Sequence, residues 1–252
     1  MIEELRSRQS AAVRYVRELA KDTDVRRENR EFLCDGEKLL EEALRSGAEI
    51  TRVLWRDKRP DGYPVFPQEF LLPEELFDYA SPMKNSPGPL FTVRIKTREA
   101  GTELNRILIL EGLQDPGNVG TVLRTADAFH VDAIILLEGC ADVYAPKTVR
   151  ASMGAVFRQT VLRMTGAEAA ALCRAQGLPL YGAALSDRAE DLRGLSLAHA
   201  AVAIGSEGHG LSRALLDQCD GELIIPMSGA AESLNAAVAA ALLMYEAMKG
   251  RA

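Results

Sequence analysis

The second half of this 252-residue chain alternates short apolar runs with helical stretches, and this alternation constrains the fold more than any other feature. The apolar runs predict buried strands at residues 107–110, 133–137, 180–183, 201–204 and 223–225. Strands that alternate with helices imply a mostly parallel sheet with helices on both faces. We therefore predict an α/β fold for this half, with loops at the carboxyl ends of the strands facing a ligand.

The first half predicts a smaller α/β unit. Val13, Val16 and Leu19 repeat at helical spacing within residues 10–20. A second helix is expected at 37–44 and short strands at 32–34, 50–55 and 91–95, whereas the charge-dense run 21–31 predicts a turn or exposed segment. Residues 58–89 hold seven of the eleven prolines and predict loops with short elements. We expect domains at 1–98 and 106–252, joined by a polar linker at 99–105.

Composition excludes several classes of protein. The N-terminus has no apolar signal region, and no stretch approaches the roughly 18 apolar residues of a membrane span, so we expect a cytoplasmic protein without membrane contact. The four cysteines include no C-x-x-C pair, and His130 and His199 have no ligand at metal spacing, so we predict no metal. The net charge of −6 argues against nucleic-acid binding by bulk charge alone.

The first candidate motif is Asp115-Pro116-Gly117-Asn118-Val119-Gly120, which follows the strand at 107–110 and precedes a helix at 121–129. Asn118 is suited to cap this helix. The motif lacks both G-x-G-x-x-G and Gly-Lys-Ser/Thr, so it gives no support for dinucleotide or nucleoside triphosphate binding. Arg124 stands among small and apolar residues, as either a surface arginine or a ligand for phosphate.

Two further motifs follow, at 147–155 and at 205–212 with 225–227 and 233–235. The acid-free run 143–163 contains Lys147 and Arg150, and it is either a phosphate site or a solvated basic face. Gly205 and its neighbours can form an ordinary strand-to-helix turn, and Ser233 and Asn235 can cap the predicted closing helix, residues 234–248. Glu207 can be a carboxylate stabilised by a helix N-terminus.

Together, and in this order, the three motifs resemble those of the SpoU/TrmH family of RNA ribose 2'-O-methyltransferases, over residues 105–250. The resemblance implies a SPOUT fold with a deep trefoil knot, a homodimer with active sites near its interface, and S-adenosyl-L-methionine as cofactor. It implies cofactor contacts at Gly205, Ile225, Met227, Ser233 and Leu234. The active-site residues that it implies are Asn118, Arg124, Glu207, Ser233 and Asn235. His209 matches a variable family position, so we do not expect it to be catalytic.

In the family mechanism the arginine at the position of Arg124 takes the proton of the 2'-hydroxyl. A guanidinium offers no acceptor while it is charged, so we favour binding of RNA phosphate and stabilisation of the developing oxyanion. A role as base would require the site to favour the neutral guanidine strongly.

The first half resembles the small substrate-binding domain of this family, which is related to RNA-binding ribosomal proteins. The matching residues are 27–30, 32–36, 39–43 and 86–88, with Cys34 where valine is common. We expect RNA contacts at Arg27, Arg30, Lys147 and Arg150, and recognition of a structured RNA through exposed nucleotides.

These observations predict a ribose 2'-O-methyltransferase that acts on structured RNA, with ribosomal RNA favoured over transfer RNA by the N-terminal domain. Two alternatives stay open. One is a transfer RNA methyltransferase. The other is a catalytically silent RNA-binding protein, against which the intact Asn118, Arg124, Ser233 and Asn235 count.

Overall fold

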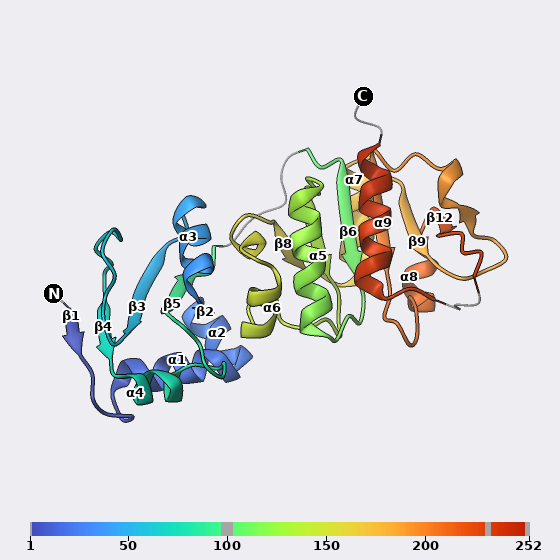
Figure 1. The fold of residues 1–252 in the computed structure, drawn as a ribbon. Helices are drawn as coiled ribbons and strands as arrows, with labels where there is room; N and C mark the ends of the chain where they lie inside the picture. The colour runs from blue at the N-terminus through green and yellow to red at the C-terminus, as the bar shows by residue number, and fades with distance from the viewer. Residues whose placement is uncertain (1, 97–102, 230–232, 250–252) are drawn as a thin grey trace. The chain divides into compact units, whose positions relative to one another are not determined.

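The computed structural model describes residues 2–96, 103–229 and 233–249, which form two compact units (Figure 1). Unit 1 comprises Met1–Thr97 with Asp142–Arg158, and unit 2 comprises Arg98–Ala141 with Gln159–Ala252. Residues 142–158 therefore pack with the N-terminal part of the chain, although they follow unit 2 residues in the sequence. The domain bounds of 1–98 and 106–252 stay a prediction, and most of the predicted linker lies outside the described residues.

Unit 1 is built on a five-stranded sheet with the order β1-β4-β3-β5-β2. Strand β5 is antiparallel to both β2 and β3, and the pairs β1·β4 and β3·β4 are parallel. The strands are β1 (Ile2–Glu4), β2 (Glu31–Asp35), β3 (Ile50–Arg56), β4 (Glu69–Leu72) and β5 (Leu90–Arg94). The helices are α1 (Ala11–Lys21), α2 (Thr23–Asn29), α3 (Glu37–Arg45), α4 (Glu74–Ala80) and α6 (Pro146–Ala151), with a 3₁₀ turn at Ala155–Phe157.

Strands β2, β3 and β5 of unit 1 bury side chains on both faces, since successive side chains point in opposite directions. Phe32 and Cys34 of β2 pack with α3 and with Val149 of α6 on one face, whereas Leu33 packs with α1 and α4 on the other. The two clusters also include successive residues of β3, with Val53 and Trp55 in one and Leu54 in the other, and this double burial explains why 53–55 is a continuous apolar run.

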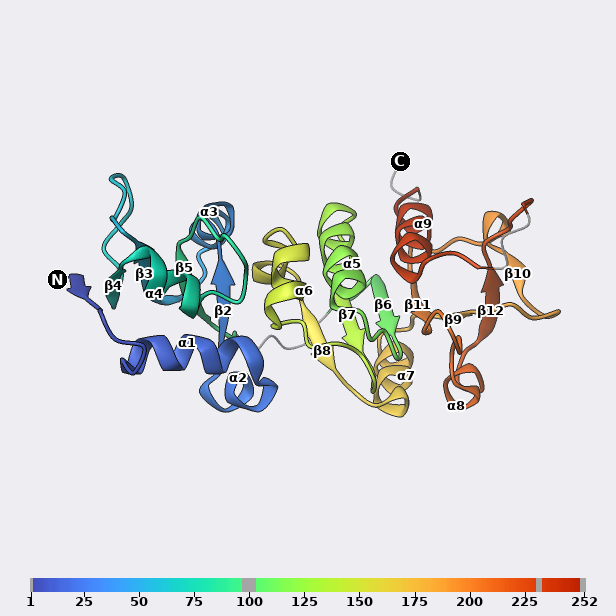
Figure 2. The same cartoon turned by 60° about the horizontal axis from the view of Figure 1, so that its bottom comes forward.

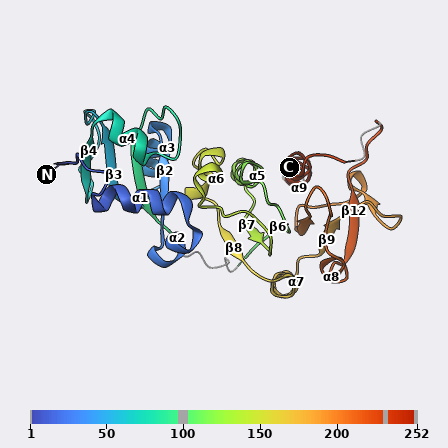
Figure 3. The ribbon, with the colours of Figure 1, turned by 90° about the horizontal axis from the view of Figure 1, so that it is seen from below.

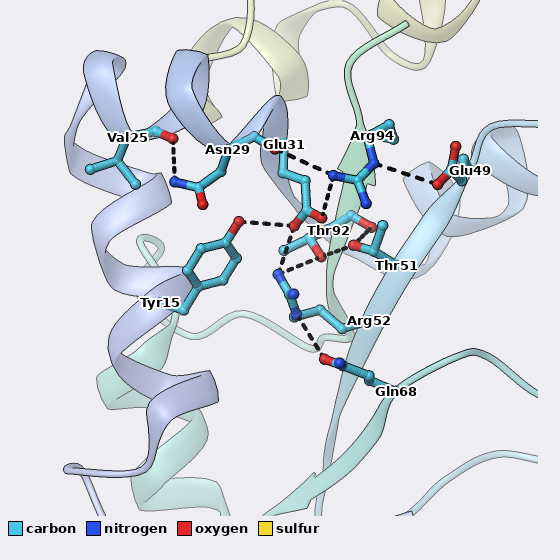
Figure 4. A network of polar contacts seen from close by, with 10 residues as sticks. All are labelled: Tyr15, Val25, Asn29, Glu31, Glu49, Thr51, Arg52, Gln68, Thr92 and Arg94. Carbon is cyan, nitrogen blue, oxygen red and sulfur yellow. Dashed lines mark hydrogen bonds and ion pairs between the residues drawn. The ribbon is translucent and has the colours of Figure 1, made fainter.

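A buried carboxylate, Glu31, ties α1 to this sheet (Figure 4). Its Oε2 accepts hydrogen bonds from Tyr15 Oη at 3.0 Å and from Arg52 Nη1 at 2.7 Å. Its Oε1 lies 3.2 Å from Arg94 Nη1. Two cations and one hydroxyl therefore satisfy this acid, as the burial of a charge requires.

Unit 2 is built on a seven-stranded sheet in which every neighbouring pair is parallel, as predicted. Its order is β10-β12-β9-β11-β6-β7-β8. The strands are β6 (Arg106–Leu110), β7 (Ala133–Leu136), β8 (Val161–Arg163), β9 (Leu180–Ala183), β10 (Glu190–Asp191), β11 (Ala200–Ile204) and β12 (Gly221–Ile224). This sheet matches the predicted α/β class.

Helices cover both faces of the sheet in unit 2. Helices α5 and α9 pack together on one face, and α7 and α8 lie on the other (Figures 2 and 3). Their bounds are α5 (Pro116–Ala128), α7 (Gly166–Ala175), α8 (Arg213–Leu216) and α9 (Ala236–Met248), with a 3₁₀ turn at Leu192–Gly194. The knot that the family resemblance implies stays a prediction.

Two local predictions are wrong. Within the run 21–31, residues Thr23–Asn29 form α2, because the side chain of Asp22 accepts hydrogen bonds from Asp24 N and Val25 N and so stabilises the first turn. The cap of α5 is Asp115 and not Asn118, since the Asp115 side chain accepts a 2.9 Å hydrogen bond from Asn118 N. Asn118 thereby lies in the first turn with its amide side chain available for other contacts.

Candidate active site

The carboxyl ends of three neighbouring strands of unit 2 surround a cavity of about 460 Å³. Its walls come from the ends of β9, β11 and β12 and from the start of α9. The lining residues include 183–185, 204–211, 223–225, Met227, Ser233, Leu234 and Ala236. All five residues predicted to contact a cofactor, namely Gly205, Ile225, Met227, Ser233 and Leu234, are among them. This position, outside the carboxyl ends of parallel strands, is where open α/β sheets bind ligands.

Gly205 directly follows β11, at a point where the backbone folds tightly upon itself. A Cβ atom on Gly205 would lie 2.0 Å from both the carbonyl carbon and the oxygen of Gly210, and 2.3 Å from Leu211 N. All three are backbone atoms, so no side-chain rotation could make room. The loop from 206 to 210 is closed by an antiparallel bridge between Ser206 and Gly210. Glycine at 205 is therefore required for this wall of the cavity.

A hydrogen-bond network joins the first motif to both parts of the third. Glu207 Oε1 accepts hydrogen bonds from Asn118 Nδ2 at 3.0 Å, from Asn235 Nδ2 at 2.6 Å and from Ala236 N at 3.2 Å. Asn235 Nδ2 also lies 3.3 Å from Asn118 Oδ1. Three residues that the sequence separates by up to 117 positions are thus brought together beside the cavity.

Asn235 has two functions in this arrangement. Its side-chain oxygen accepts hydrogen bonds from Ala237 N and Val238 N and caps α9, as the sequence predicted. Its amide nitrogen meanwhile donates to Glu207, whose carboxylate also accepts from the first amide of α9. Glu207 is therefore a carboxylate at a helix N-terminus, where the helix dipole favours negative charge, although the helix is α9 rather than one that follows Glu207 directly.

Arg124 lies on α5, and its side chain is exposed. Among the residues that the structure describes, it forms no hydrogen bond or ion pair and does not line the cavity. Ser233 lines the cavity directly before Leu234. The structure thus brings Asn118, Glu207 and Asn235 into contact, and it leaves Arg124 exposed to a ligand outside the protein.

The four cations predicted to contact RNA all belong to unit 1, and all are exposed. Arg27 lies 3.7 Å from Asp24, and Arg30 adopts a left-handed conformation at the end of α2. Lys147 and Arg150 lie on α6, where Arg150 Nη1 is 3.5 Å from Met83 Sδ. Gly154 of the second motif packs against Glu42 of α3. The space that a side chain at 154 would need is filled by Glu42, so the glycine makes room for protein rather than for a ligand.

Sequence reasoning missed Glu111, which directly follows β6. Its carboxylate accepts hydrogen bonds from Ser212 N at 2.7 Å and from Ser212 Oγ at 2.8 Å, and so fixes the chain immediately after the 206–210 loop. The sequence did contain a signal for Glu111: it is an acidic residue at the carboxyl end of a predicted strand, and it stands shortly before the first motif.

Neither a metal cluster nor a membrane span is found in the part of the chain that the structure describes. No group of three or more His, Cys, Asp or Glu side chains is placed to hold a metal ion. Among the same residues, no helix combines the length and apolar content that a membrane span requires.

The chain belongs to the SpoU rRNA methylase family, which residues 105–245 match. This is the class of protein that the parallel sheet and the contacts between the first and third motifs define. Among relatives, the chain is 36% identical over 216 residues to 23S rRNA (guanosine(2553)-2'-O)-methyltransferase RlmP of Bacillus subtilis, covering 85% of this chain and 87% of the relative.

Two solved structures share the fold over the whole chain. One is a crystal structure of an RNA 2'-O ribose methyltransferase, which is 30% identical in sequence and has a TM-score of 0.81. The match covers 100% of this chain and 99% of the methyltransferase chain. An AdoMet-bound rRNA methyltransferase from Sinorhizobium meliloti is 25% identical with a TM-score of 0.86 and the same coverage. The family resemblance inferred from the three motifs is thereby confirmed.

Proposed function

We propose that the protein transfers a methyl group from S-adenosyl-L-methionine to a ribose 2'-hydroxyl of structured RNA, with ribosomal RNA as the substrate class. The observation that carries the proposal is the convergence of the first and third motifs beside one cavity, where Glu207 contacts both Asn118 and Asn235. Family membership and the rRNA methyltransferase RlmP, similar over most of both chains, support the reaction and the substrate class.

The cavity fits the cofactor in size and in the kind of wall it offers. Ligand pockets of about 300–1,000 Å³ are typical of small-molecule sites, and this one is about 460 Å³. Gly205, Gly208 and Gly210 line the cavity, and at Gly208 and Gly210 a Cβ would meet nothing within 4 Å, which permits close approach of a nucleoside to the backbone. We assign Gly205, Ile225, Met227, Ser233 and Leu234 to hold it. When bound, the cofactor supplies an electrophilic methyl group on a sulfonium.

The residues around the cavity then act mainly by positioning. Glu207 holds the amides of Asn118 and Asn235 in fixed orientations, and Ser233 lines the adjacent cavity. Arg124 has no protein partner among the described residues, so its fork of donors is free for an RNA phosphate and for the oxyanion that develops on the ribose. Alignment of the hydroxyl with the methyl group can account for much of the rate.

We propose that the active form is a homodimer through α9. Val238, Leu242 and Tyr245 lie at helical spacing along one side of α9 and are 49%, 40% and 47% exposed. These apolar side chains form one face that a second copy of the chain would cover. Leu242→Glu should convert a dimer into a monomer in light scattering, and a monomeric wild-type protein would contradict this assignment.

Two measurements test the function itself. Calorimetry with a chelator present should show binding of S-adenosyl-L-methionine, because no metal is needed. Mapping of 2'-O-methylation across total RNA, from cells with and without the protein, should reveal a ribosomal nucleotide that loses its methyl group when the protein is absent. Loss of a methyl group only from transfer RNA would favour the alternative substrate, and no loss would favour a silent RNA-binding protein.

A further inference from the structure

Helix α1 of unit 1 carries an unusual concentration of positive charge for a chain whose net charge is −6. Between residues 6 and 21 the sequence has five cations and one acid, Glu18. Four of these cations lie on α1 or directly before it, and we call them the α1 strip: Arg8, Arg14, Arg17 and Lys21. Val13, Val16 and Leu19 are buried against the sheet, so the cations lie on the remaining surface of the helix.

The α1 strip differs from the other arginines of unit 1 in that carboxylates do not neutralise it. Elsewhere in the unit, most arginines contact an acid: Arg26 with Asp142, Arg45 with Glu41 and Glu42, Arg52 and Arg94 with Glu31, Arg56 with Glu74, Arg59 with Glu69, and Arg158 with Glu42. Within the described residues, Arg8, Arg14 and Arg17 form no ion pair. Figure 4 shows the contrasting, compensated case at Glu31.

An aromatic ring lies within the strip. The guanidinium carbon of Arg17 is 3.8 Å from the centroid of the Tyr79 ring, and that of Arg8 is 4.5 Å away. Arg17 also donates a hydrogen bond to the Tyr79 carbonyl, which fixes α1 to α4. The ring thus holds two guanidinium groups at the surface, where their charge can bind phosphate and their planes can stack on RNA bases.

We propose that the α1 strip is a binding surface for RNA, contacting phosphates through Arg8, Arg14 and Lys21. This inference rests on the proposed function, because it takes the RNA substrate as the ligand. An anionic membrane is the weaker fit, since the apolar side of α1 is already buried in unit 1 and cannot insert into lipid. The near-neutral total charge of the first hundred residues, 18 cations against 19 acids, conceals this uneven distribution.

The test compares three variants of the full-length protein for binding to a large-subunit rRNA transcript over a series of KCl concentrations. Arg8→Gln with Arg14→Gln removes two strip cations while keeping residues that tolerate a helix. Affinity should fall roughly 10-fold or more, and the slope of log affinity against log salt should decrease by about two. Lys38→Gln with Lys58→Gln removes the same charge from exposed positions outside the strip and should have a much smaller effect.

Glu18→Gln removes the only acid of the helix and should strengthen RNA binding, which a change that merely damages the fold would not do. In methyl transfer, the arginine double variant should raise KM for RNA and leave kcat and cofactor affinity unchanged. The same variants are also tested for binding to phosphatidylserine vesicles. The inference fails if the two double variants bind RNA with equal affinity. It also fails if the arginine double variant loses affinity for the vesicles but not for RNA. If wild-type protein binds RNA through the strip but transfers no methyl group, the proposed function fails and this inference stands.

Discussion

The carboxylate of Glu207 accepts a 2.6 Å hydrogen bond from Asn235 Nδ2 and, through the same oxygen, a 3.0 Å hydrogen bond from Asn118 Nδ2. One oxygen therefore orients two amides from different helices, at the starts of α5 and α9. Because hydrogen bonds to an ionised acceptor are roughly twice as strong as neutral ones, the charge of Glu207 matters for this orientation.

Glu207→Gln should consequently weaken the network without unfolding the protein. The glutamine can still offer one carbonyl oxygen, but its amide group cannot accept from Asn118, Asn235 and Ala236 together as strongly as the carboxylate does. We expect kcat/KM for methyl transfer to fall about 10-fold, and further in Glu207→Ala. The melting temperature should change little, because Glu207 is exposed. Unchanged kcat/KM in both variants would show that the network does not position the reactants.

Arg124→Ala should reduce kcat by roughly 10²- to 10³-fold if the guanidinium stabilises developing negative charge. Affinity for S-adenosyl-L-methionine should stay the same, since Arg124 is not one of the described residues that line the cavity. Arg124→Lys should recover little activity, because an ammonium cannot reproduce a planar fork of donors. Arg174→Ala, which removes another exposed arginine from a helix of unit 2, is the matched control and should retain full activity. Full activity of Arg124→Ala would reject the assigned function of Arg124.

Gly205→Ala and Gly208→Ala should have opposite outcomes although the two glycines belong to one motif. An added Cβ at 205 would meet backbone atoms of Gly210 and Leu211, so the 206–210 loop must open and the cavity wall must change. At 208 a Cβ would meet nothing within 4 Å. For Gly205→Ala we expect calorimetry to show at least a 100-fold loss of cofactor affinity, because overpacking costs about 1–3 kcal/mol and the cavity wall is displaced. For Gly208→Ala we expect an affinity close to that of the wild type. Similar affinities in the two would contradict the structure of this loop.

The parallel sheet could be predicted because its strands are buried on both faces and therefore continuous in apolar residues, as in Ile107–Leu110. Helix α2 could not, since its stability comes from the Asp22 cap and from the buried Arg26, and neither produces an apolar period. The cap of α5 was predictable: proline at Pro116 is typical of the first helical residue and points to Asp115.

The contacts of the candidate site were beyond reasoning from local spacing alone. Glu207 lies 28 residues from Asn235 and 89 from Asn118, and no sequence period relates positions so far apart. The motifs could be assigned to one site only through the family resemblance. Likewise, the packing of residues 142–158 within unit 1 depends on contacts of Val149, Val156 and Phe157 with strands more than fifty residues earlier in the chain.

A final prediction concerns Asp35, at the end of β2 in unit 1. Burial raises the pKa of its carboxyl above the ordinary 3.8, although hydrogen bonds from Ser86 and Ser81 and the charge of Arg150 act in the opposite direction. A raised pKa means that the folded state holds this proton more tightly than the unfolded state. The protonated carboxyl of Asp35 therefore contributes to the stability of the folded state. This contribution is fully present below pH 3.8 and is lost as the pH rises through the folded-state pKa.

Asp35→Asn removes this titration, so the free energy of unfolding of the wild type relative to the variant should decrease as the pH rises from 3.8 through the folded-state pKa, and then stay constant. Urea unfolding followed by the fluorescence of Trp55 measures it, because Trp55 is the single tryptophan and is buried in unit 1. Asp61→Asn, at an exposed loop position of the same unit, controls for the loss of a carboxylate. If the free energy of unfolding of the wild type relative to Asp35→Asn increased with pH over this range, the hydrogen bonds and the charge of Arg150, rather than burial, would determine the pKa of Asp35.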